Sequence, residues 1–133
     1  MSAPRREPAI RTILMPKDTN ANGTIFGGII LSHIDLAAVV EAHDLNPRRA
    51  YVTVAMDQIV FHEPVFVGDL VSFYTRLVKV GRTSVTVAVD VVAQRRQDPS
   101  VEVQVTEATV TYVAVDEHRR PVPIRDEEVA DGA

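Results

Sequence analysis

One acidic residue lies in a stretch where charge is costly. Asp35 is near the middle of Gly28–His43, a mostly apolar run whose length predicts a helix. A buried carboxylate must be hydrogen-bonded, paired with a cation or protonated. Composition alone leaves two interpretations open: a polar contact between subunits, or a carboxylate that faces a substrate cavity and acts there as a base or nucleophile.

The segment before this helix favours the second interpretation. Pro16–Gly28 is small and polar, and it ends in the pair Gly27 and Gly28. Glycines are poor helix formers, but they let a ligand approach the backbone closely. The first N–H groups of a helix lack intrahelical acceptors, so they could bind a phosphate or stabilise an oxyanion. A tight turn required by packing is the alternative. A nucleotide-type phosphate loop is excluded, because no lysine follows the glycines.

Other catalytic arrangements find no support. The chain has no cysteine, which excludes disulfides, thiolate metal sites and cysteine nucleophiles. Ser32 and His33 are consecutive on the predicted helix and point to different sides, so they form no nucleophile–base pair. His33 and Asp35 share no helical face either. The four histidines lack metal-ligand spacing. We therefore expect no metal and no other cofactor.

Composition indicates one small acidic domain. The 133 residues suit a single domain, 1–133, in which we expect 1–8 and 126–133 to be frayed. A net charge of −4 argues against nucleic acid as a partner. No signal peptide is evident and no apolar run reaches the roughly 20 residues of a membrane span. We therefore expect a cytoplasmic protein with no membrane contact.

β-branched residues dominate the rest of the chain, since 21 of the 23 valines follow residue 50. Short turns between the apolar runs predict antiparallel strands. In the last run the apolar alternation changes phase after Val105, which predicts a β-bulge. The class is α+β, with one helix and about five strands, at residues 10–15 (an edge strand), 51–61, 70–80, 83–93 and 101–115.

The predicted helix has apolar residues around nearly its whole circumference. Such a helix must be buried on all sides. One sheet covers one side, and the remaining apolar surface calls for a second subunit. We therefore expect an obligate oligomer.

Five segments, in order and spacing, resemble the YciA/BACH-type acyl-CoA thioesterases of the hotdog superfamily, and together they span roughly residues 8 to 124. They are Pro16–Asp35, Met56–Phe61, Pro64–Asp69, Lys79–Val85 and Thr106–Asp116. The resemblance implies a hotdog fold, in which a curved antiparallel sheet wraps a long central helix. It also implies a homodimer that assembles further into a hexamer, as a trimer of dimers.

The resemblance implies site residues as well. An asparagine in the loop and an aspartate on the helix act across the dimer interface, and they correspond to Asn20 and Asp35. The Gly28 N–H would stabilise the oxyanion, with Phe26 and Gly27 beside it in the substrate site. Residues around the later hairpin would contact coenzyme A: Lys79, Gly81, Arg82, Thr83 and Ser84, with Arg76, Arg95 and Arg96 as possible additions whose simpler role is solvated charge.

The implied reaction is hydrolysis of an acyl-CoA thioester, with coenzyme A as a substrate moiety and product. Asp35 would act either as general base on water or as nucleophile, and Asn20 would position water or donate to the carbonyl. Two other functions stay open. One is a non-catalytic acyl-CoA binding or sensing protein, and a weaker one is a dehydratase or hydratase, which needs an acid–histidine dyad that the helix does not supply.

Overall fold

A five-stranded antiparallel sheet and one long helix make up the computed structural model, which describes residues 7–126. The strand order is β1-β3-β4-β5-β2, so β1 and β2 are the two edges. The elements are β1 (Ile10–Ile13), the short 3₁₀ helix η1 (Pro16–Asp18), α1 (Gly27–Leu45), β2 (Ala50–Phe61), β3 (Leu70–Val80), β4 (Ser84–Gln94) and β5 (Glu102–Val115).

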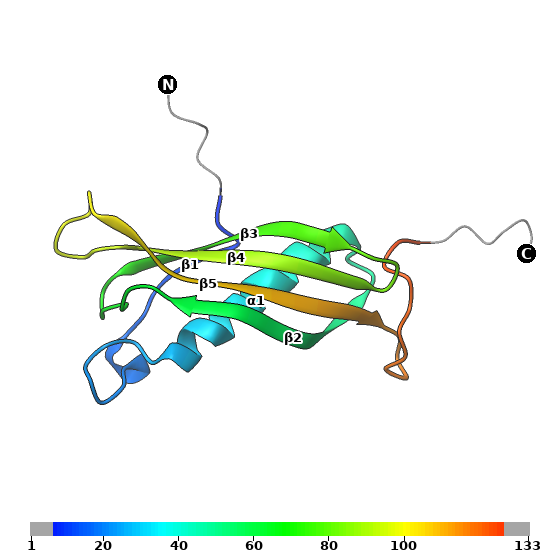
Figure 1. Cartoon of the computed structure of the whole chain (residues 1–133), viewed down its shortest axis with the longest axis horizontal. Helices are drawn as coiled ribbons and strands as arrows, with labels where there is room; N and C mark the ends of the chain where they lie inside the picture. The colour runs from blue at the N-terminus through cyan, green and yellow to red at the C-terminus, as the bar shows by residue number, and fades with distance from the viewer. Residues whose placement is uncertain (1–6, 127–133) are drawn as a thin grey trace, which may run out of the picture.

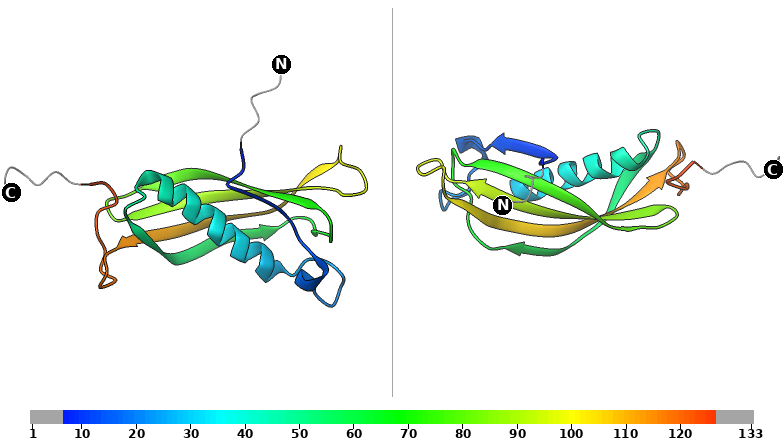
Figure 2. Two further views of the ribbon diagram at one scale, coloured as in Figure 1. Left: turned by 180° about the vertical axis from the view of Figure 1, so that it is seen from behind. Right: turned by 90° about the horizontal axis from the view of Figure 1, so that it is seen from above.

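The helix α1 crosses one face of the sheet diagonally, and the sheet curls around it (Figures 1 and 2). The valine alternation explains this packing, because every second residue of β4 points to the helix. Val85, Val87, Val89 and Val91 are all buried, and the buried side of α1 faces this sheet core with Ile30, Ile34, Ala37, Ala38 and Ala42. This is the hotdog fold that the family resemblance implies.

The expected elements agree with the structure to within two residues at their ends. The helix begins at Gly27 rather than Gly28 and ends at Leu45 rather than His43. The predicted bulge is confirmed in β5: Val91 pairs with Thr106, whereas Val92 pairs with Gln104, so Val105 is the extra residue. The short first strand lies at an edge, as expected.

One side of the helix and most of β2 are exposed in the single chain. Leu36 on α1 is 56% exposed and Val54 on β2 is 55% exposed, and no residue of β2 is buried. An open edge strand beside exposed apolar side chains is a surface that proteins cover. In residues 7–126 no helix is long and apolar enough to cross a membrane.

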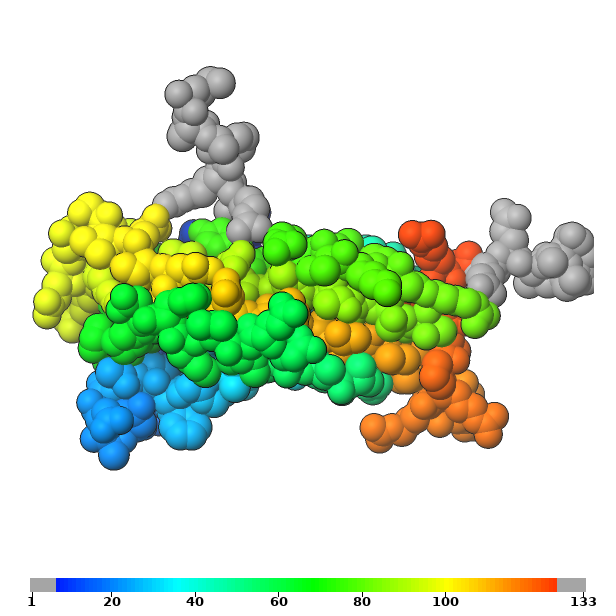
Figure 3. Space-filling view, in the orientation of Figure 1, coloured from blue at the N-terminus to red at the C-terminus, as the bar shows by residue number. Residues whose placement is uncertain are grey.

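The connections gather at the two ends of the molecule. The loop between β1 and α1, the β2–β3 connection and the β4–β5 hairpin lie at one end, and the first of these projects from it (Figures 1 and 3). The β3–β4 hairpin lies at the other end, with the last described residues. Ile124 is buried there and donates its N–H to the Arg82 oxygen.

The segments expected to fray fall mostly outside the described residues. Asp126, the last residue described, forms ion pairs with Arg48 at 2.5 Å and with Arg49 at 3.3 Å. These contacts attach the end of the described chain to the turn after α1.

Candidate active site

Asp35 is half-buried on the side of α1 that faces β2 and β5. Its Oδ1 accepts a hydrogen bond from the Tyr112 hydroxyl at 2.8 Å and another from the Thr53 hydroxyl at 2.9 Å. Within residues 7–126, Oδ2 accepts no hydrogen bond. The carboxylate is therefore held in one orientation through one oxygen, and the other stays available for chemistry.

Tyr112 comes from β5 and is 1% exposed, in phase with the buried valines of that strand. Its hydroxyl also lies 2.5 Å from the backbone oxygen of Asp35, so its one proton is shared between that oxygen and Oδ1. Burial raises the pKa of Tyr112 well above its ordinary value, and the Asp35 carboxylate raises it further. The proton thus remains on the tyrosine at neutral pH, where it acts as a fixed donor to Asp35.

Asp35 lines a pocket of about 460 Å³ along the uncovered side of the helix. The lining combines polar groups beside the carboxylate with apolar ones farther along, and it consists of Ser32, His33, Asp35, Leu36, Val39, Tyr51, Thr53 and Tyr112. Because this pocket opens on the surface that the chain leaves uncovered, an occupant can come from a neighbouring protomer as well as from solvent.

The start of α1 presents free backbone donors. The N–H groups of Gly27 and Gly28 find no acceptor in the described part of the chain. A Cβ on Gly28 would lie 2.7 Å from Cε1 of Phe26, and one on Gly27 would lie 3.3 Å from Cζ of Phe61. The two glycines therefore let aromatic rings pack against the helix start, which is a packing requirement, the alternative that the sequence left open to a ligand contact.

Asn20 organises the loop that leads into the helix. Its Oδ1 accepts the N–H of Asn22 at 2.8 Å and that of Thr24 at 3.3 Å, while its Nδ2 donates to the Thr24 hydroxyl at 3.1 Å. The backbone of Phe26 is tied to the same loop through the Asp18 oxygen, at 2.8 Å. Asn20 thus fixes the loop beside the glycines and keeps one amide hydrogen for another acceptor.

The structure does not bring Asp35 and the glycines together within one chain. Gly28 and Asp35 lie on the same side of α1 but two turns apart, which separates their backbones by about 10 Å along the helix axis. One thioester carbonyl cannot contact the Gly28 N–H and receive an attack directed by Asp35 of the same protomer at that separation.

The hairpin predicted to contact coenzyme A lies at the end of the molecule opposite the start of α1 (Figures 1 and 2). Its turn is closed by the Gly81 N–H, which donates to the Ser84 oxygen at 2.8 Å, and the Thr83 oxygen accepts the Ala114 N–H. Arg82 and Lys79 are exposed. Arg82 also lines a pocket with Arg125, so two cations flank this turn.

Arg95 has a structural partner. Its guanidinium forms a 2.7 Å ion pair with Asp69, which is 2% exposed, and lies over the Phe66 ring. It is therefore not a solvated charge. It fixes the turn at Gly68, whose φ of +90° only glycine adopts without strain.

Sequence reasoning missed Thr53 and Tyr112. Tyr112 carried a usable signal, since it continues the alternation of core residues in β5, and a buried tyrosine hydroxyl needs a hydrogen-bond partner. Thr53 carried no such signal in the sequence, because nothing distinguishes it from the other threonines of the predicted strands. Among the described residues, no three histidine or acidic side chains gather as a metal site would require.

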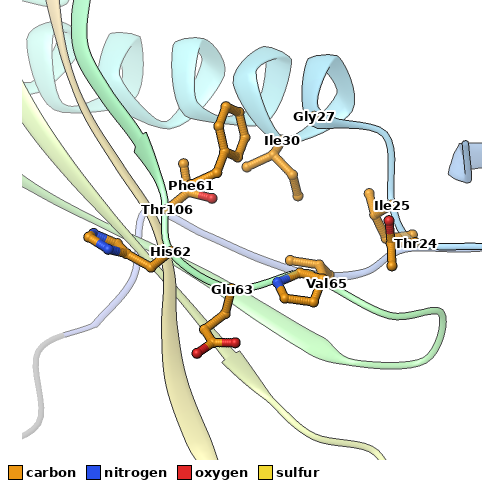
Figure 4. A pocket seen from close by; sticks show the side chains of 10 residues that line it. Thr24, Ile25, Gly27, Ile30, Phe61, His62, Glu63, Val65 and Thr106 are labelled. Atoms are coloured by element: carbon orange, nitrogen blue, oxygen red, sulfur yellow. The ribbon is translucent and has the colours of Figure 1, made fainter. Parts of the chain in front are cut away.

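A second pocket, of about 350 Å³, lies beside the start of the helix (Figure 4). Gly27 and Ile30 of α1 form one wall, and the end of β2 with the residues after it forms the other. This pocket and the Asp35 pocket share no lining residue, so the two are separate within one chain.

Comparisons with known proteins bear on the family and the fold of the chain. The family model of the thioesterase superfamily matches residues 22–100. The acyl-CoA thioester hydrolase YciA of Escherichia coli is 38% identical over 122 residues, covering 90% of this chain and 92% of the relative. An uncharacterised acyl-CoA thioester hydrolase of Zymomonas mobilis is 47% identical over 123 residues, covering 92% and 80%. A hexameric hotdog-fold thioesterase of Campylobacter jejuni has a TM-score of 0.84 at 48% identity, covering 90% and 91%.

Proposed function

This chain belongs to the thioesterase superfamily, among relatives of the YciA type, and we propose that it hydrolyses acyl-CoA thioesters to a free acid and coenzyme A. The observation that carries the proposal is the state of Asp35. One carboxylate oxygen is held by Tyr112 and Thr53, and the other is free in an open pocket. A carboxylate that is oriented but not neutralised is suited to act as a base or nucleophile.

The reaction that we propose begins with attack on the thioester carbonyl carbon. As general base, Asp35 takes a proton from water while the water oxygen bonds to that carbon, and the negative charge that forms on the carbonyl oxygen is stabilised by the Gly28 N–H. The carbon–sulfur bond then breaks, and the thiolate leaves and receives the proton. In the alternative route Asp35 attacks the carbonyl carbon directly and the carbon–sulfur bond breaks, which releases the thiolate and leaves an anhydride that water then hydrolyses to the free acid and the Asp35 carboxylate.

The 10 Å separation along α1 leads us to propose a site shared by two protomers. Asp35 of one protomer would act on a thioester held at Gly28 of its partner, with the free amide hydrogen of Asn20 directed to the carbonyl or to water. Phe26 and Gly27 would border the thioester. A dimer related by twofold symmetry then contains two such sites.

The uncovered surface supports the same arrangement. We propose that protomers pair through the open edge of β2 and the exposed side of α1, where Leu36 and Val54 lie. Related thioesterases of known structure are hexameric, and we propose that three such dimers form a hexamer here.

Coenzyme A carries phosphates, and we propose that the β3–β4 hairpin of a neighbouring protomer binds them. Lys79 and Arg82 supply charge there, and Gly81, Thr83 and Ser84 supply a turn with backbone and hydroxyl donors. We assign this role to the hairpin of a neighbouring protomer because the hairpin of the same chain lies at the end of the molecule opposite the start of the helix. We expect the enzyme in the cytoplasm and without a cofactor.

The test is thiol release from a panel of acyl-CoA esters by the wild-type protein and by Asp35→Asn. We expect turnover to fall at least about a hundredfold in the variant, because the base is lost while size is kept. Asp44→Asn, which removes an exposed carboxylate from the same helix, is the matched control and should keep full activity. Normal turnover by Asp35→Asn contradicts the proposal. Binding of CoA esters without any thiol release identifies a non-catalytic binding protein instead.

A further inference from the structure

Thr106 has a buried hydroxyl without a hydrogen-bond partner. The residue is 1% exposed, and its Oγ1 is the one buried side-chain polar atom in the described part of the chain that makes no hydrogen bond. Leaving such a group unpaired costs about 1–3 kcal/mol, so it requires an explanation.

The β-bulge in β5 explains how the hydroxyl came to be there. Val105 is the extra residue, and its backbone oxygen accepts the N–H of His62 at 2.8 Å and that of Glu63 at 3.3 Å. These bonds fix the segment after β2 against the bulge. The bulge re-aims Thr106 and leaves its hydroxyl without a neighbour to bond.

The hydroxyl lies at the pocket beside the start of the helix, which Thr106 lines together with Gly27. In Figure 4, Thr106 lies next to Phe61 and faces the space between Ile30 on the helix and Val65 on the opposite side. In a mostly apolar pocket, the few polar groups fix the orientation of a ligand. Gly27, whose N–H is free, forms part of the same pocket's helical wall, and Gly28 follows it in the first turn.

We propose that this pocket holds the acyl group of the substrate, and that Thr106 selects short acyl chains with a neutral oxygen, a hydroxyl or a ketone, on the carbon second from the thioester carbonyl. The inference rests on the proposed thioesterase function. A carbonyl bound at Gly28 directs the first carbons of its chain past Gly27 into the pocket, where the Thr106 hydroxyl can donate to a ketone or exchange a hydrogen bond with a hydroxyl.

The charges around the pocket exclude an acyl group that ends in a carboxylate. No lysine or arginine is among the described residues that line it, and Glu63 contributes a negative charge. His62 is directed to Glu107, with 3.5 Å between their side-chain atoms. A carboxylate would therefore enter without a cation to pair with.

The experiment compares kcat/KM for butyryl-CoA, 3-hydroxybutyryl-CoA, acetoacetyl-CoA and succinyl-CoA. We expect the wild type to favour the two oxygenated four-carbon esters over butyryl-CoA by about three- to tenfold, the usual effect of one neutral hydrogen bond. Succinyl-CoA should be the poorest of the four. Thr106→Val, which keeps the shape and removes the hydroxyl, should abolish the preference, so that the two oxygenated esters are hydrolysed no faster than butyryl-CoA.

Two further variants make the result specific. Thr106→Ser restores a hydroxyl and should restore the preference. Thr111→Val removes a hydroxyl on the same strand that is bonded to Thr86 and lines no pocket with Thr106, so it should not alter the ratio. Hydrolysis of butyryl-CoA with no preference in the wild type, or an unchanged ratio in Thr106→Val, overturns the inference and leaves the proposed function intact. Failure to hydrolyse all four of these esters overturns the inference, and it overturns the proposed function as well only if the wider acyl-CoA panel also gives no thiol release.

Discussion

The Tyr112 hydroxyl lies 2.8 Å from Oδ1 of Asp35 and 2.5 Å from the backbone oxygen of the same residue. One buried group of the sheet therefore contacts both the Asp35 side chain and the backbone of the helix that carries it. Together with the Thr53 hydroxyl, this contact leaves Asp35 with a single free oxygen and a single orientation.

Tyr112→Phe should lower kcat by about tenfold to a hundredfold, because a hydrogen bond to a charged group is lost while the ring remains. KM should change little, since Tyr112 orients the base and does not bind the substrate. Steady-state kinetics on one acyl-CoA ester checks this. Tyr74→Phe on β3 is the control and should behave as wild type. An unchanged kcat in Tyr112→Phe would show that the Tyr112 hydroxyl does not orient Asp35 for catalysis.

The raised pKa of Tyr112 predicts lability in alkali. The unfolded chain releases this proton near pH 10, whereas the folded protein retains it. The titration of Tyr112 therefore leaves the free energy of unfolding unchanged below pH 10 and lowers it as the pH rises above 10. The loss from this residue is at most about 1.4 kcal/mol per pH unit. Urea unfolding from pH 9 to 11.5 should show a shallower decline in Tyr112→Phe than in wild type. Parallel curves would contradict the assignment.

Asp69→Asn should destabilise the fold by about 2–3 kcal/mol, because Arg95 keeps its charge and loses its buried partner. Asp69 also accepts the Phe66 N–H at 2.9 Å, so the turn at Gly68 loosens with it. Thermal unfolding measures the loss, and Asp44→Asn serves as the exposed control. A melting temperature equal to that of the control would show that the ion pair contributes nothing.

Leu36→Lys should dissociate the oligomer. The side chain is 56% exposed in the single chain and lies on the face that we assign to the partner, so a charge there would be buried by association. Sedimentation should show smaller species, and thiol release should fall in proportion to the fraction of protein that has dissociated. An active, fully assembled Leu36→Lys protein would place the interface elsewhere.

Much of the fold could be predicted from the sequence because its pattern is local. The alternation of Val85 to Val91 is typical of a strand with one buried face, and the change of phase after Val105 indicates the bulge. The surroundings of Asp35 could not be predicted. Tyr112 is 77 positions away in sequence and Thr53 is 18 positions away, and only the strand register brings them to the carboxylate. The sequence identified the acidic group, and the fold supplies its partners.

The unpaired Thr106 hydroxyl lies beyond sequence reasoning for a related reason. A bulge can be inferred from a phase change, but the direction in which it turns each side chain depends on the neighbouring strand and on the segment at His62. The separation of Gly28 from Asp35 can be predicted from the sequence, because the two residues lie two helical turns apart.

The claim that a catalytic site is shared by two protomers is tested most directly by mixing two inactive variants. Asp35→Asn and Asn20→Ala are each expected to be nearly inactive alone. After joint unfolding and refolding at equal amounts, half of the dimers should contain one chain of each kind and one intact site, which restores about a quarter of wild-type thiol release. No recovery from a mixture that sedimentation shows to be reassembled would contradict the account.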